Sequence, residues 1–178
     1  GRSSVIMLSL TVPSLGNGAF SGSNANYYIY VPYPSLDAYK TAAIWSNYEH
    51  RICPMAYATV PGYGVGNDKW VFIASPLSED VIPTTIDNML LGTNYDLYQF
   101  DQSATDEEWQ NYKVDSFNLV NGQGYVYANE AEVNIIFKGV FNEDETKVVN
   151  LDYDAEKANP GWNLVGNPFP VDAYIDRP

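Results

Sequence analysis

The chain has a single histidine and a single cysteine, His50 and Cys53, three positions apart just beyond a predicted helix. Thiolate catalysis needs an activated thiol, a group that orients the base and an oxyanion site. A serine triad would also have to use His50, and the sequence has no G-x-S-x-G turn. We therefore expect a buried cysteine, a solvent-facing histidine and no catalysis. One cysteine also excludes an intrachain disulfide and a zinc site built from several thiolates.

Acidic residues are far more numerous than basic ones, with 22 Asp and Glu against 9 Lys and Arg, for a net charge of −13. With so many carboxylates, some must lie close together by chance. No single pair therefore identifies a glycosidase site. The acidic turns at 142–145 and 152–156 carry the oxygen ligands that Ca²⁺ prefers. Lys157 stands where an EF-hand loop would need glycine. We expect these turns to be solvated, with calcium binding as the open alternative, and we predict no metal or cofactor.

The same charge balance bears on partners. Binding to nucleic acid or to an anionic membrane draws on clustered Lys and Arg, and nine scattered cations form no such cluster. We therefore expect neither partner.

Tyrosine is the most abundant aromatic residue, with 15 copies. Aromatic rings stack on the apolar faces of sugars, so exposed tyrosines along a strand form a candidate glycan-binding platform. The alternative is that alternate tyrosines pack across to neighbouring strands or bond at the edge of the core. The candidate ligand-binding residues are Tyr27, Tyr28, Tyr30, Tyr33, Tyr125 and Tyr127.

Short β-branched and aromatic runs separated by turn residues dominate the sequence, and they are typical of a sandwich or a barrel. Asn and Gly at 121–124 predict a hairpin turn between two of these runs. The run at 5–12 also matches the apolar part of a signal peptide. The predicted strands are 5–12, 27–31, 70–74, 95–100, 117–120, 125–128, 133–138, 147–153 and 162–165.

Helical periodicity is confined to two places. Residues 35–48 predict one helix, with Ser35 as its N-cap and Asp37 in its first turn. Residues 105–112 predict a helical turn or two. The prolines and glycines of 53–69 indicate an irregular connector.

Two segments repeat one pattern, 92 positions apart. Residues 70–76 and 162–168 each read Trp, any residue, two apolar residues, a small residue, a polar residue and Pro. We favour equivalent places in a pseudo-symmetric sheet over two unrelated strands. If the copies are equivalent, the chain stops before its second unit is complete, and strand edges left open are prone to pair with another chain.

A family resemblance rests on Tyr28-Ile-Tyr-Val-Pro32, Leu36, Ala38-Tyr-Lys40, Trp45-Ser-Asn-Tyr48 and Arg51-Ile52, preceded by Gly18-Ala-Phe20 and Gly22. This pattern resembles the terminal repeat of BspA-like leucine-rich-repeat surface proteins of Bacteroidetes. The region from Trp70 to Pro168 is similar to a β-rich module of large secreted proteins of the same bacteria. The resemblance implies export, surface display and an adhesive role. A repeat array needs about three units to bury a continuous core, and at most two fit here.

Together these observations predict a mainly β chain: a β-sandwich-like domain at 59–178, truncated at its C-terminus if the copies are equivalent, preceded by a terminal leucine-rich-repeat cap-like segment at 1–58. We expect a non-catalytic, adhesin-like module of a larger bacterial protein, extracellular or at the cell surface, that acts in adhesion or protein–protein interaction. Its expected partner is a host or bacterial surface protein or glycan. The alternative is a carbohydrate-binding accessory module that uses the surface tyrosines.

Overall fold

The computed structural model describes residues 3–23, 26–63 and 69–174. The chain is mainly β, with two sheets, and it divides into two compact units, Gly1–Ala56 and Tyr57–Pro178. The sequence placed this boundary after residue 58. Among the described residues, no helix is both long and apolar enough to cross a membrane.

Parallel strands organise the first unit. β1 (Ser3–Ile6) pairs with β2 (Tyr27–Pro32), and β2 pairs with the start of β3 (Ile52–Val60). Ser3 lies opposite Tyr27, 24 positions later, and Ile29 lies opposite Ile52, 23 positions later. The chain therefore adds a parallel strand to this sheet at nearly constant intervals along the sequence.

The connection from β2 to β3 is not the single helix that the sequence predicts over 35–48. It consists of a 3₁₀ helix (Tyr33–Ser35), α1 (Leu36–Thr41) and a second 3₁₀ helix (Trp45–Arg51). Ala42 is extended, and Ile44 has a φ of +68°. Tyr39 and Trp45 are both buried, with ring centroids 4.9 Å apart. In a straight helix, residues six positions apart point roughly 120° away from each other, so burying both rings together requires the break.

Three side chains of this connection hold the backbone of the segment after β1. Tyr39 donates a hydrogen bond to the carbonyl of Ser9 (3.0 Å), and Trp45 Nε1 donates to Pro13 (2.8 Å). Ser35 occupies the N-cap position of α1, but its hydroxyl donates to Leu10 (2.7 Å) and does not cap the helix. The strand predicted at 5–12 therefore ends at Ile6, because these carbonyls are bonded to side chains.

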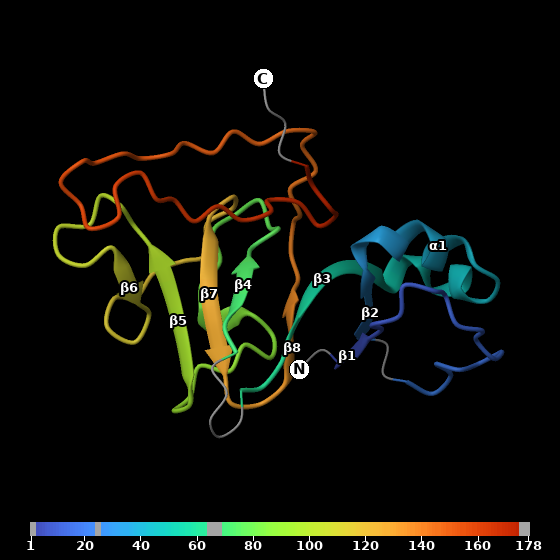
Figure 1. The fold of residues 1–178 in the computed structure, drawn as a ribbon. Coiled ribbons are helices and arrows are strands. Elements are labelled where there is room, and N and C mark those ends of the chain that lie inside the picture. The colour runs from blue at the N-terminus through green and yellow to red at the C-terminus, as the bar shows by residue number, and fades with distance from the viewer. Residues whose placement is uncertain (1–2, 24–25, 64–68, 175–178) are drawn as a thin grey trace. The chain divides into compact units, whose positions relative to one another are not determined.

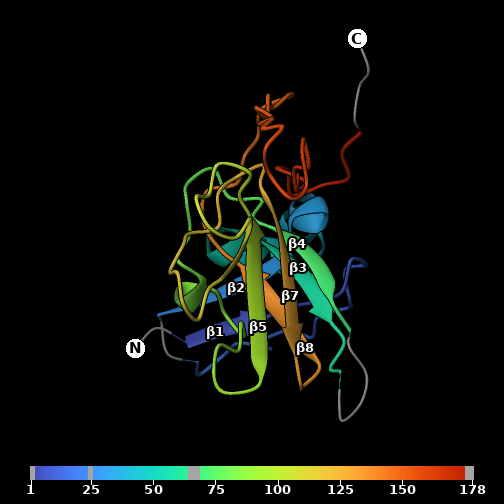
Figure 2. The same cartoon turned by 60° about the vertical axis from the view of Figure 1, so that its left-hand side comes forward.

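The second unit contains an antiparallel sheet in the order β4-β7-β5-β6: β4 (Val71–Ala74), β7 (Gly124–Asn129), β5 (Tyr95–Phe100) and β6 (Trp109–Asn111). Both views show β7 lying between β4 and β5 (Figures 1 and 2). β3 continues into this unit beside β8 (Val133–Phe137), where Thr59 Oγ1 donates to Asn134 Oδ1 (2.7 Å). A short 3₁₀ helix covers Pro83–Thr85.

Several sequence predictions for this unit are wrong. Part of the expected connector at 53–69 is β3, although Pro54 lacks the amide donor that a strand normally supplies; residues 64–68 lie outside the described part. The helical turn expected at 105–112 does not form: 105–108 is irregular, and Trp109–Asn111 is β6, which pairs with β5. The expected hairpin does not form: β7 pairs with β4 and β5, whereas 117–120 makes a single bridge, Leu119 to Val81.

No strand forms at 147–153 or 162–165. Figure 1 shows the stretch from 143 to 161, in orange, as a long run of chain without helix or strand. The repeated segments therefore differ, since 70–76 contains β4 and 162–168 contributes only the bridge of Val165 to Gln123. They nevertheless meet: a Cβ added at Gly166 would lie 2.4 Å from the Cβ of Ala74.

Replacing Trp45 by Phe tests whether the hydrogen bond from Trp45 to Pro13 and the burial of its ring stabilise the first unit. The change removes the donor to Pro13 and leaves a void, so we expect a loss of about 2–3 kcal/mol in local stability. Because two units can unfold separately, the measurement is hydrogen exchange of the β2 amides. Trp162, which is 60% exposed, is the matched control, and Trp162→Phe should change exchange by less than about 0.5 kcal/mol. Equal effects of both variants would contradict this stabilising role of Trp45.

Candidate binding site

Two of the predicted ligand-binding tyrosines belong to the core. Tyr125 and Tyr127 on β7 are fully buried, so neither can form part of a surface platform. The Tyr125 hydroxyl accepts from the backbone N–H of Val120 (2.7 Å) and donates to the carbonyl of Asn118 (2.9 Å). The Tyr127 hydroxyl donates to Leu90 (2.8 Å). Burial raises the pKa of each phenol to about 12.

The other four tyrosines lie in the first unit. Tyr27 is buried beneath the Arg51 guanidinium, which lies 4.5 Å from its ring centre, so its face is covered too. Tyr28 and Tyr30 are half-buried on the opposite side of β2, with ring centroids 6.4 Å apart, and Tyr33 is half-buried in the first 3₁₀ helix. The six residues are thus divided between two units and form no single platform.

Cys53 and His50 show no activated pair. Cys53 is a free, half-buried residue of β3, and burial raises the pKa of its thiol, which keeps the sulfur protonated. His50 is exposed near the end of the second 3₁₀ helix. In the described ranges, no three His, Cys, Asp or Glu side chains cluster as metal ligands would.

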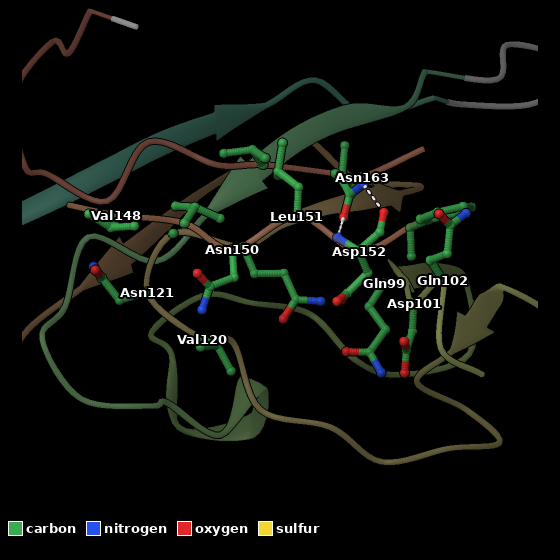
Figure 3. Close-up of a pocket in the computed structure, with 16 residues that line it drawn as sticks. Gln99, Asp101, Gln102, Val120, Asn121, Val148, Asn150, Leu151, Asp152 and Asn163 are labelled. Carbon is green, nitrogen blue, oxygen red and sulfur yellow. Dashed lines mark hydrogen bonds between the residues drawn. The ribbon is translucent and has the colours of Figure 1, made fainter. Parts of the chain in front are cut away.

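A cavity of about 400 Å³ lies beside β5 in the second unit (Figure 3). Its walls are the end of β5, the 120–123 turn, the 148–152 segment and residues 163–165. Most of its polar lining consists of amides and carboxylates: Gln99, Asp101, Gln102, Asn121, Gln123, Asn150, Asp152 and Asn163. These groups bind polar ligands by hydrogen bonds, and the lining holds neither a histidine nor a cysteine.

Asn163 holds one wall in place. Its Oδ1 accepts the backbone N–H of Asp152 (2.9 Å), and its Nδ2 donates to the Asp152 carbonyl (2.9 Å), as the dashed lines of Figure 3 show. One carboxamide thus bonds both polar groups of a single residue, as a neighbouring strand would. These two bonds hold the extended chain at Asp152 without a neighbouring strand.

A buried polar cluster anchors the far end of the same segment. Gln102 Nε2 donates to Glu108 Oε1 (3.2 Å) and to the Asn159 carbonyl (2.6 Å), while its Oε1 accepts the N–H of Gly161 (2.7 Å). The Glu108 carboxylate accepts from Asn159 Nδ2 (2.7 Å). Gln102 and Glu108 are almost completely buried, and these bonds compensate their desolvation.

Asn121 joins the two repeated segments. Its Nδ2 donates to the carbonyls of Ser75 (3.3 Å) and Pro168 (2.8 Å), and its Oδ1 accepts from Asn142 Nδ2 (3.3 Å). The sequence predicts a turn at 121–124. It does not indicate that Asn121 in this turn bonds the proline-containing ends of both repeated segments.

The sequence missed an aromatic surface on the sheet. Trp70 is 46% exposed, Phe72 74% and Trp109 38%, and Tyr98 is half-buried between them. Trp70, Tyr98, Trp109 and Val126 line a shallow hollow of about 250 Å³. Residues 70–74 looked like a buried strand because they are continuously apolar. In a strand Phe72 and Ile73 point to opposite faces, and the structure buries Ile73 and exposes Phe72.

Asn121→Ala tests the junction. The change leaves two carbonyls and the Asn142 amide without a partner in a buried site, so we expect a loss of about 2–4 kcal/mol in the free energy of unfolding. Urea denaturation measures it. Asn150→Ala is the control, because Asn150 lines the same cavity but is exposed, and it should cost less than about 0.5 kcal/mol. Similar losses in both variants would argue against the junction.

The raised pKa values of Tyr125 and Tyr127 predict that the fold becomes less stable at alkaline pH. Each phenol has a pKa raised from 10 to about 12 in the folded chain, so the unfolded chain loses its protons first. This contribution to stability is complete below pH 10 and is lost as the pH rises toward 12. Unfolding free energies measured over that interval should fall less steeply in Tyr125→Phe than in the wild type. Parallel curves would show that Tyr125 does not contribute.

Comparisons with protein-family models, with curated proteins and with solved structures found no match to this chain. The function must therefore be argued from the surfaces described above.

Proposed function

We propose that this chain is a non-catalytic binding module of an exported protein and acts in adhesion. The observation that carries the proposal is the exposed aromatic surface on the β4-β7-β5-β6 sheet. Trp70, Phe72 and Trp109 remain accessible on a sheet whose two central strands are paired on both sides. Exposing large aromatic side chains next to one another is costly in water, and such patches usually mark interaction sites.

The residue types support recognition rather than catalysis. Tryptophan and tyrosine are enriched among the residues that dominate binding energies, because they offer large rigid contact areas. The aromatic hollow is lined by Trp70, Tyr98, Trp109 and Val126, and the described polar lining of the cavity is mostly amide, with Asp101 and Asp152 as its carboxylates. Aromatic rings and amide groups of this kind support binding through shape and hydrogen bonds.

We further propose that 1–58 forms the last turns of a leucine-rich-repeat-like solenoid. Its support is the parallel pairing of strands at intervals of 24 and 23 residues, within the 20–29 typical of such repeats. Phe20 packs edge-on against Tyr48 (5.1 Å) and Trp45 (6.2 Å), so residues that carry the family resemblance form the core. For 59–178 we propose a β-sandwich-like domain, supported by buried side chains on both β7 and β8.

A carbohydrate-binding accessory module is the second candidate. Of its six predicted tyrosines, Tyr27, Tyr125 and Tyr127 are buried, and the aromatic surface of the second unit supplies more accessible rings. The observation that favours it is the mixture of aromatic rings and amide groups in the second unit.

Retention on immobilised ligands tests the module as a binder. The full chain is passed over purified extracellular matrix proteins and over soluble polysaccharides, and we expect saturable binding to at least one of them. Phe72→Ser combined with Trp109→Ser should weaken that binding at least tenfold. Tyr153→Ser, at an exposed tyrosine outside the aromatic surface, should not. Binding that survives the double substitution, or a bound ligand recovered in cleaved form, would contradict the proposal.

A further inference from the structure

The aromatic hollow of the second unit has features that point to one class of ligand. We infer that it binds a neutral glycan chain, whose sugar rings stack on Trp70 and Trp109 and whose hydroxyl groups bond the polar residues beside Tyr98. This inference rests on the proposed binding function and names the ligand of that same surface.

The sheet register places the aromatic residues across neighbouring strands. Phe72 lies opposite Val126, and Val126 lies opposite Tyr98, so the three form one row on one face. Trp109 lies opposite Phe100 in the adjoining row. Paired strands about 4.8 Å apart set the spacing of Phe72, Val126, Tyr98 and Trp109, and Trp70 immediately precedes β4. The paired strands therefore hold most of these side chains in place before any ligand arrives.

Neighbouring rings fix the orientation of both tryptophans. Trp70 contacts Tyr98 edge to face, with centroids 5.8 Å apart, and Trp109 contacts Phe100 in the same way at 5.0 Å. Little side-chain entropy remains to be lost on binding. The faces of aromatic rings carry partial negative charge, which attracts the C–H groups on the less polar side of a sugar ring.

Polar side chains lie next to Tyr98 on the same face of the sheet. Asp96, two residues before Tyr98 on the same face of β5, accepts hydrogen bonds from Lys113 Nζ (2.8 Å) and from Asn111 Nδ2 (3.1 Å). Asn111 lies directly opposite Tyr98. Asp96 and Lys113 have equal and opposite charges and are each more than one-third exposed. These side chains offer donors and acceptors to hydroxyl groups without requiring a charged ligand.

Size and charge argue against a protein partner. A standard protein interface uses roughly 20–30 residues on each side. Among the described residues, four side chains line this hollow, far fewer than such an interface needs. A second copy of the chain would bring another net charge of −13, and acidic polysaccharides would be repelled in the same way. A neutral glycan avoids these costs.

Affinity electrophoresis of the full chain tests the inference. Native gels contain a neutral β-glucan, a neutral mannan or polygalacturonate, which is acidic. We expect retardation by at least one neutral polymer and none by polygalacturonate. Trp70→Ala and Trp109→Ala should each weaken the retardation about tenfold, whereas Trp70→Tyr, which keeps an aromatic ring, should retain most of it.

Tyr174→Ala is the matched control, because Tyr174 is 92% exposed and does not line the hollow; it should bind as the wild type does. Near-ultraviolet circular dichroism verifies that each variant is folded. Retention of a purified protein through Trp70 and Trp109 without glycan binding would overturn the ligand class and leave the binding function standing. A concentration-dependent dimer that Trp70→Ala abolishes would also overturn it. A chain that binds neither glycan nor protein would overturn both proposals.

Discussion

The carboxamide of Asn121 is the contact on which the second unit depends most. Its Nδ2 donates to the carbonyls of Ser75, which precedes Pro76, and of Pro168. Its Oδ1 accepts a hydrogen bond from Asn142. Three segments far apart in the sequence thereby meet at one end of β7. Gly124 and Gly166 allow the approach, because a Cβ at either position would lie within 3.0 Å of a neighbouring segment. The sheet supplies the surface, and this junction determines which segments cover its end.

Both units use the same means of holding irregular chain. In the first, the side chains of Ser35, Tyr39 and Trp45 bond the carbonyls of residues 9–13. In the second, Gln102 and Asn163 do the same for a segment that has no ladder. This explains a composition in which only 17% of residues are charged. Amide and hydroxyl groups serve as structural partners of the backbone, so fewer polar groups are left to mark a functional site.

Local sequence patterns correctly predicted several strands. The neighbours of these strands in the sheet also have β-forming sequences. β2, β4, β5 and β8 are confirmed within a residue or two. The helix at 35–48 failed because tertiary burial of Tyr39 and Trp45 outweighed helical periodicity. The strand at 147–153 failed because a β-forming sequence still needs a partner. For the site, tyrosine content drew attention to Tyr125 and Tyr127, whereas the exposed rings are those of Trp70, Phe72 and Trp109. Composition does not distinguish a ring in the core from one on the surface; the register of the strands does.

The segment from 143 to 161 has a consequence for the motions of the molecule. Near its end it is latched by Gln102 and Glu108, and Trp162 follows immediately, with its ring 6.5 Å from that of Phe100. Phe100 in turn orients Trp109. A segment held by a few side-chain bonds opens more readily than a sheet. Opening of this segment would separate Trp162 from Phe100, the ring that Trp109 contacts, without breaking a pair of strands.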